Sequence, residues 1–334
     1  MTSVTFKIII ATIISITLFS CNGNQQKNDK PVITVSILPQ EYFVRQIAGD
    51  HFSINVMIPP GASPATYEPT PSQLAELSRA DLYLKMGYTG FEMAWMDKIT
   101  ASNQQMEVVN LSDGIDLITE GTMQKHDDAI HINEDQQSEH NHEQHQQNQK
   151  DAQHDDGQDN INNKAHQHSH HHGGIDPHTW LSPRNAEIIA KNIYQALSVA
   201  YPNYQDTFIK NLESFQQSLN ELDLKITNTL KDFHSRAFFT YHPALSYFSR
   251  DYNLEQYPLE LAGKTPSTAH LRNLIDIGKE KEIKTVFLQM QFDQKNAEVL
   301  AKEIDAEIVQ INPLDPEWYD QMIFITNKIK ENFQ

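Results

Sequence analysis

A helical stripe near the middle of the chain limits the folds open to this sequence more than any other feature. Over residues 203–231, apolar side chains recur at every third or fourth position. They are Tyr204, Phe208, Leu212, Phe215, Leu219, Leu222, Ile226 and Leu230. This spacing predicts one amphipathic helix, which at about 1.5 Å per residue would reach roughly 40 Å. Such a helix fits a stiff strut along two lobes, although a surface helix of one lobe would show the same stripe.

The chain on either side of this helix follows one plan twice. Short β-rich runs in the first half lie at residues 32–38, 53–58, 82–86 and 106–111. In the second half they lie at residues 236–241, 254–259, 283–288 and 306–311. Helical segments separate the runs, and this alternation predicts parallel α/β sheets. In both halves the first run leads through a proline into an aromatic-bearing helix, so we expect a duplicated α/β lobe.

Ser182 and Pro183 mark the start of a further helix, because serine suits the N-cap and proline suits the first turn. Pro202 ends that helix. We therefore expect an N-terminal lobe over residues 31–201, a linking helix over residues 202–231 and a C-terminal lobe over residues 232–334.

The first twenty residues are typical of a secretion signal. Lys7 supplies a positive charge, and residues 8–19 form an apolar stretch too short to span a bilayer. Cys21 follows a cleavage site and is the sole cysteine, so no intramolecular disulfide can form. The arrangement resembles the acylated cysteine of a bacterial lipoprotein, with residues 21–30 as its tether; ordinary secretion with an incidental cysteine is the alternative. We expect an extracytoplasmic protein held to a membrane through Cys21.

Eleven of the sixteen histidines lie in one low-complexity segment, residues 124–174. The same segment holds ten Asp or Glu, three Lys and ten Gln. It cannot bury enough apolar surface to offset its ordering entropy, so we expect a disordered loop within the N-terminal lobe. Neutral imidazole binds zinc and other late transition metals. The segment is therefore either a loop that catches metal ions loosely or a solvated insert.

The acidic balance of the chain excludes some classes of partner. Its net charge of −18 argues against nucleic acid, and cations are the natural small partners. The sequence also lacks H-E-x-x-H, G-x-S-x-G and a phosphate-binding glycine loop. This absence counts against a metal-dependent hydrolase, the alternative from the enzyme class.

Two histidines outside the histidine-rich segment stand where a cleft would present them. His242 directly follows the strand at 236–241, at the carboxyl end where open α/β sheets present ligand groups. His178 lies just before the helix that begins at Ser182, and Asp176 is placed to order that turn. Each histidine alone would suit a structural role. Together with the histidine-rich segment, they indicate a metal site.

Four segments occur in order along residues 32–333 and carry a family resemblance. They are PPGASPATYEPTPSQL (59–74), DPHTWLSPRNA (176–186), YHPALSYFSRDY (241–252) and INPLDPEWYDQM (311–322). These segments resemble the zinc/manganese solute-binding proteins of ABC transporters. The resemblance implies two α/β lobes joined by one long rigid helix, with a metal cleft between them. It also implies a monomer that captures Zn²⁺ and passes it to an ABC permease and its ATPase.

Carried over residue by residue, the resemblance gives an incomplete set of metal ligands. The family's DPH and YHP histidines fall on His178 and His242. Its first histidine falls on Ala65, which cannot bind metal, and the aspartate of some members falls on Asn312, whose amide oxygen suits harder ions than zinc. Zinc generally takes about four donors, so other groups must complete the shell.

Two acidic residues are the candidates to complete this shell. Glu68 follows Ala65 by three residues on the same loop, although it could instead cap the next helix. Glu260 follows a strand and occupies the matching place in the second lobe. Gln289 and Gln291 are polar candidates at the end of another strand.

The function that the sequence favours is zinc capture for ABC uptake, by a lipoprotein without enzymatic turnover. Manganese is the alternative ion, but it prefers carboxylates and water, so Ala65 and Asn312 count against it. A surface adhesin or a metal-storage lipoprotein would share the binding residues but not the transport partners.

Overall fold

The computed structural model describes residues 30–119, 174–233, 236–261 and 263–333. The predicted signal peptide, Cys21 and almost all of the histidine-rich segment lie outside these ranges. Within them, no helix is both long enough and apolar enough to cross a membrane.

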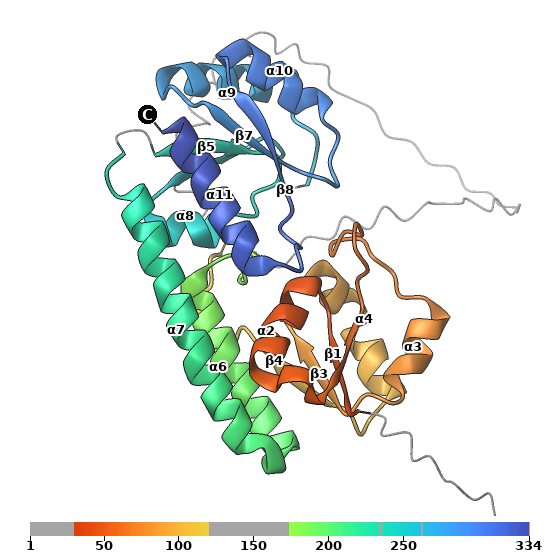
Figure 1. Cartoon of the computed structure of the whole chain (residues 1–334). Coiled ribbons are helices and arrows are strands. Elements are labelled where there is room, and N and C mark those ends of the chain that lie inside the picture. The colour runs from red at the N-terminus through yellow and green to blue at the C-terminus, as the bar shows by residue number, and fades with distance from the viewer. Residues whose placement is uncertain (1–29, 120–173, 234–235, 262, 334) are drawn as a thin grey trace, which may run out of the picture. The chain divides into compact units, whose positions relative to one another are not determined.

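The first half of the chain forms a parallel sheet of four strands (Figure 1). In chain order its elements are β1 (Val32–Val35), α2 (Leu38–Ala48), η1 (Gly49–His51), β2 (Ser53–Val56), α3 (Pro71–Leu77), β3 (Leu82–Lys85), α4 (Gly90–Ser102) and β4 (Glu107–Asn110). The strand order across the sheet is β2-β1-β3-β4, and α3 packs against α4.

The second half forms a second parallel sheet on the same plan. Its elements are β5 (Ala237–Thr240), α8 (Ser246–Tyr252), β6 (Glu255–Pro258), α9 (Thr268–Glu280), β7 (Thr285–Gln289), α10 (Lys295–Ile304), β8 (Glu307–Ile311) and α11 (Trp318–Asn332). The strand order is β6-β5-β7-β8, and α9 packs against α10 as α3 does against α4. The prediction of a duplicated α/β fold is confirmed.

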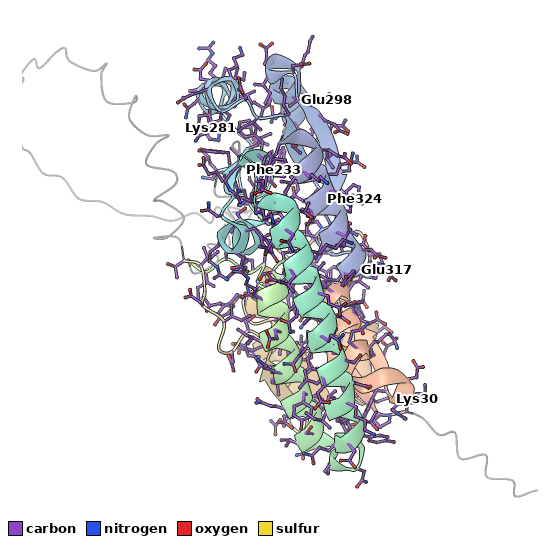
Figure 2. All side chains as sticks on the ribbon, turned by 60° about the vertical axis from the view of Figure 1, so that its left-hand side comes forward. Lys30, Phe233, Lys281, Glu298, Glu317 and Phe324 are labelled. Atoms are coloured by element: carbon purple, nitrogen blue, oxygen red, sulfur yellow. The ribbon has the colours of Figure 1, made fainter. Side chains whose placement is uncertain are left out.

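Two long helices connect the halves and run side by side (Figures 1 and 2). They are α6 (Pro183–Ala200) and, after the short η2 (Pro202–Tyr204), α7 (Gln205–Leu230). α7 buries every residue of the predicted stripe except Tyr204, which stands just before it. It packs against α2 of the first half and against α8 and α11 of the second. α7 is therefore the connecting strut and not a surface helix of one lobe; the lobe boundaries remain predictions.

The buried apolar residues form two clusters. The larger one extends from the first sheet through α6 and α7 to α11, and it includes Trp180 and Trp318, which are both almost completely buried. The smaller one lies between the second sheet, α9 and α10. The segment just before α6 thus belongs to the core.

The first strand is shorter than the sequence predicts. β1 ends at Val35, because the side-chain oxygen of Gln40 accepts hydrogen bonds from the backbone N–H groups of Ser36 (2.9 Å) and Ile37 (3.0 Å). Two backbone N–H groups beyond β1 are thus bound by this side chain, and the chain turns into α2, whose first turn holds Pro39.

Candidate metal centre

The two histidines singled out from the sequence lie against each other. His178 precedes α6, and His242 follows β5 by two residues. Their Nε2 atoms are 3.3 Å apart, and their rings meet edge to face with centroids 5.0 Å apart. One histidine comes from the segment before α6 and the other from the second sheet, so the site joins distant parts of the chain.

Asp176 fixes the imidazole of His178. Its Oδ1 atom accepts a hydrogen bond from the backbone N–H of His178 and contacts the ring Nδ1, both at 2.8 Å. The carboxylate is buried, with 2% of its side chain exposed, while His178 keeps 14%. A buried carboxylate two residues away thus holds the ring with its other nitrogen turned toward His242.

Glu260 plays the same part for His242. Its Oε1 lies 2.5 Å from the Nδ1 of His242, and 6% of the Glu260 side chain is exposed. The contact follows from the pairing of β5 with β6, in which Thr240 stands beside Pro258. Two residues further along each strand, the same register brings His242 beside Glu260.

The backbone and ring of His242 are also held from the next strand. Gln289, at the end of β7, accepts from the N–H of His242 (3.2 Å) and donates to its carbonyl oxygen (2.7 Å). The imidazole stacks on Phe292 with ring centroids 5.5 Å apart. Gln289 was expected as a polar group of the cleft, but its amide is engaged by the histidine backbone.

The two carboxylates decide which nitrogens face the site. An ionised carboxylate only accepts hydrogen bonds, so each Nδ1 must carry the proton of the bond it makes. When both rings are neutral, the Nε2 atoms of His178 and His242, which are 3.3 Å apart, turn lone pairs toward each other. Such a pair is satisfied by a cation, either a proton or a metal ion.

The separation of the two nitrogens fits a tetrahedral zinc ion. Zinc binds imidazole nitrogen at about 2.0–2.1 Å, and two such ligands of one tetrahedral ion lie about 3.3–3.4 Å apart. The observed 3.3 Å between the Nε2 atoms of His178 and His242 matches this spacing. The two nitrogens thus have the spacing of two imidazole ligands of one zinc ion.

Three other positions considered from the sequence, Ala65, Glu68 and Asn312, form no hydrogen bond with either histidine in the part of the chain that the structure describes. Within the described residues, no set of three or more His, Cys, Asp or Glu side chains is arranged to hold one ion. Ala65 and Glu68 are exposed in the loop between β2 and α3, and the cap of α3 is made by Thr70 and Gln73 without Glu68. The side-chain oxygen of Asn312 accepts from the N–H of Leu314 (3.2 Å) in a turn.

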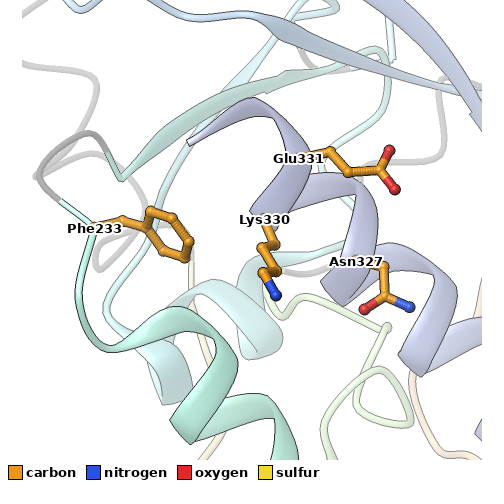
Figure 3. A pocket seen from close by; sticks show the side chains of 4 residues that line it. All are labelled: Phe233, Asn327, Lys330 and Glu331. Carbon is orange, nitrogen blue, oxygen red and sulfur yellow. The ribbon is translucent and has the colours of Figure 1, made fainter. Parts of the chain in front are cut away.

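A separate hollow lies at the end of α11 (Figure 3). It is lined by Phe233, Asn327, Lys330 and Glu331. Its lining includes the ammonium group of Lys330 and the carboxylate of Glu331, and no imidazole. Its donor chemistry does not suit zinc, so the histidine pair is the better candidate metal centre.

Comparison with known proteins identifies the family. Residues 33–332 match the family described as "Zinc-uptake complex component A periplasmic". The chain belongs to this family. The resemblance to metal-binding proteins of ABC transporters that the four sequence segments carry is thereby confirmed.

Similar proteins with known names agree with this membership. The high-affinity zinc uptake system protein ZnuA of Bacillus subtilis is 30% identical over 296 residues, which are 86% of this chain and 80% of that protein. The zinc-binding lipoprotein AdcA of Streptococcus pneumoniae R6 is 26% identical over 315 residues. The match covers 92% of this chain but 55% of AdcA, so the chain spans about half the length of that relative. A crystal structure of ZnuA aligns with a TM-score of 0.74 and 31% identity, covering 92% of this chain and all of that one.

Proposed function

We propose that this protein is an extracytoplasmic solute-binding protein that captures Zn²⁺ between His178 and His242 and delivers it to an ABC permease and its ATPase. One observation carries the proposal. Two Nε2 atoms face each other at the spacing of a tetrahedral zinc shell, and a buried carboxylate holds each ring by its Nδ1. The family's description as a zinc-uptake component, and the zinc named for its relatives, support the same ion.

Two imidazoles leave about two places in a zinc shell. We propose that Glu68 fills one of them, because it shares a loop with Ala65, where the family's first histidine falls, and its side chain is exposed and so free to move. Glu260 is the second acidic candidate, and it would have to leave the Nδ1 of His242 to reach the ion. Water completes what the side chains leave open.

The donor chemistry favours zinc over manganese. Imidazole nitrogen suits zinc, whereas manganese prefers carboxylate, carbonyl and water oxygen. The atoms that converge here are two nitrogens, and the nearby carboxylates of Asp176 and Glu260 are engaged in holding the rings. Manganese would have to displace them from the imidazoles.

The proposal includes the anchor and the partners. Cys21 would carry a lipid that holds a monomer at the membrane surface, close to the permease that receives the ion. Binding without turnover is the expected activity. A storage or adhesin lipoprotein would bind zinc equally well, and it would differ in leaving the ATPase activity of the transporter unchanged.

Calorimetric titration with Zn²⁺ and Mn²⁺ tests the proposed ion and site. The protein and its variants should lack residues 124–174, so that eleven additional histidines do not add weak sites. We expect one tight zinc site, far weaker manganese binding, and a loss of at least about a hundredfold in His178→Ala and in His242→Ala. His51→Ala is the control, because His51 is exposed beside Tyr204 and away from the pair. If either site variant keeps the parental affinity, that histidine is not a ligand.

A further inference from the structure

A buried tyrosine hydroxyl links the two segments that carry the site histidines. Tyr247 lies on α8, five residues after His242, and its side chain is completely buried. Its hydroxyl accepts a hydrogen bond from the backbone N–H of Ile118 (3.2 Å) and donates one to the backbone carbonyl of Asp176 (2.9 Å). Asp176 is the residue that holds the imidazole of His178.

The Tyr247 hydroxyl bonds to the two stretches of backbone that lead into and out of the histidine-rich segment. Thr119 and Ile175 form an isolated antiparallel bridge, and the N–H of Asp176 donates to the carbonyl of Ile118 at 2.9 Å. The two chain ends that flank the segment therefore lie side by side. Tyr247 bonds to both of them, one through its N–H and one through its carbonyl group.

A second residue of α8 strengthens this attachment. Arg250 donates to the backbone carbonyl of Asp116 (2.7 Å), and its guanidinium lies 5.1 Å from the ring centre of Tyr247. Burial raises the pKa of the Tyr247 hydroxyl, so the group keeps the proton that it donates. Two residues of α8 therefore hydrogen-bond to the chain that flanks the histidine-rich segment, including Asp176 just before His178. The first turn of α8 follows His242 along the chain.

We propose that Tyr247 is a positioning residue of the metal site, which acts through Asp176 on His178. The proposal rests on the proposed function. When the backbone of Asp176 is held in place, so is its carboxylate, which contacts both the backbone N–H and the ring Nδ1 of His178. His242 lies in the segment that leads into α8, the helix that carries Tyr247. The hydroxyl of Tyr247 therefore helps to set the distance between the two Nε2 atoms. A phenylalanine would fill the same space but would leave the Asp176 carbonyl and the Ile118 N–H without this partner.

The test compares two tyrosines of the same helix. Tyr247→Phe removes the hydroxyl that reaches Asp176, and Tyr252→Phe removes one that donates to Asp223 at 2.8 Å, on α7. Zinc affinity of the full chain is measured by competition with a chelator strong enough that only the tightest site holds zinc. Mutation of a group that orients a metal ligand typically lowers metal affinity about 10–100-fold. Tyr247 orients Asp176 and not the ligand itself, so we expect Tyr247→Phe to lower zinc affinity about three- to tenfold. Tyr252→Phe should change the zinc affinity by less than about twofold, because its hydroxyl does not reach Asp176.

A double-variant cycle distinguishes positioning from a general loss of stability. If Tyr247 acts through His178, the loss caused by Tyr247→Phe should disappear when His178→Ala is already present. An equal loss in both backgrounds, or equal affinities for Tyr247→Phe and Tyr252→Phe, would overturn the inference. If His178→Ala itself leaves the affinity unchanged, the proposed function fails instead. Urea unfolding of each variant shows that the compared proteins are folded.

Discussion

Each imidazole of the candidate metal centre is oriented by one buried carboxylate, and the chain brings the two carboxylates to their rings in different ways. Asp176 stands two residues before His178, so a local turn suffices. Glu260 stands eighteen residues after His242 and reaches it through the pairing of β5 with β6. The second arrangement depends on strand register, so it is sensitive to anything that shifts the second sheet.

Replacement of Glu260 should separate an orienting role from a ligand role. Glu260→Gln keeps an oxygen that can accept from Nδ1 of His242, so we expect a zinc affinity within about threefold of the parent, whereas Glu260→Ala should lose about 10–100-fold. Glu298→Ala on the exposed face of α10 is the control. Calorimetry measures all three. An equally large loss in Glu260→Gln would support the sequence prediction that Glu260 binds the ion.

The exposed loop between β2 and α3 carries a second prediction at this scale. If Glu68 binds zinc, Glu68→Gln should weaken binding by at least about tenfold, because the amide keeps the shape but not the charge that neutralises the cation. Ala65→His should then add little. Competition with a zinc chelator measures both variants. A silent Glu68→Gln together with a tighter Ala65→His would show that water fills the place instead.

Among the elements, α6 determines where His178 stands, and its first turn is fixed to α8. The hydroxyl of Ser182 accepts from the backbone N–H of Asn185 (3.1 Å) and donates to the carboxylate of Asp251. Asn185 in turn donates to the carbonyl of Thr179 at 2.9 Å. The cap thus anchors the residues that follow His178 to both its own helix and the second half of the chain.

Loss of the Ser182 cap should lower the free energy of unfolding more than loss of an exposed helix cap. Ser182→Ala removes both bonds of a completely buried hydroxyl. It leaves Oδ2 of Asp251 without the donor that Ser182 supplies, while Oδ1 keeps its bond from Arg250, so we expect about 2–3 kcal/mol lower stability. Ser267→Ala removes the exposed cap of α9 and should cost about 1 kcal/mol. Urea unfolding compares the two variants by their midpoints, provided that the dependence of the unfolding free energy on urea stays the same. Equal shifts of the two midpoints would contradict the anchoring role of Ser182.

Local sequence signals predicted the elements well but not the long-range contacts of the site. The spacing of apolar residues in α7, and the Ser-Pro start of α6, depend on neighbours a few positions away. The contact of Glu260 with His242 depends on the register of β5 with β6, and that of Gln289 depends on the register of β5 with β7. Register follows from packing of whole strands, so Glu260 could be suspected from the repeat but its partner could not.

At the scale of the whole molecule, the internal repeat accounts for the architecture. Both sheets have the same strand order, and α7 packs against helices of both halves. The sequence did not predict the hydrogen bonds that connect the segment before α6 with the segment that leads into α11. The indole N–H of Trp180 donates to the carbonyl of Pro313 (2.8 Å), and that of Trp318 donates to the carbonyl of Trp180 (2.9 Å). These exchanged bonds join residues more than 130 positions apart, which no local pattern reveals.

Removal of the histidine-rich segment should leave the tight site intact. The bridge between Thr119 and Ile175 places the ends of the segment together, so a short linker can replace residues 124–174 without moving Asp176. We expect fewer zinc ions bound in total, and a tightest Kd within about threefold of the parent, which is under about 1 kcal/mol. Calorimetry of both forms gives stoichiometry and affinity. A hundredfold loss of tight binding would overturn this division between loose capture and the fixed site.

We expect one zinc ion to bind between two imidazoles that come from separate parts of the chain. Anomalous diffraction at the zinc edge, from crystals of the mature protein grown with zinc, tests it most directly. We expect one strong anomalous peak about 2.0–2.1 Å from the Nε2 atoms of both His178 and His242, with each Nδ1 still bonded to its carboxylate. A strong peak that contacts neither histidine, or only one of them, would contradict it.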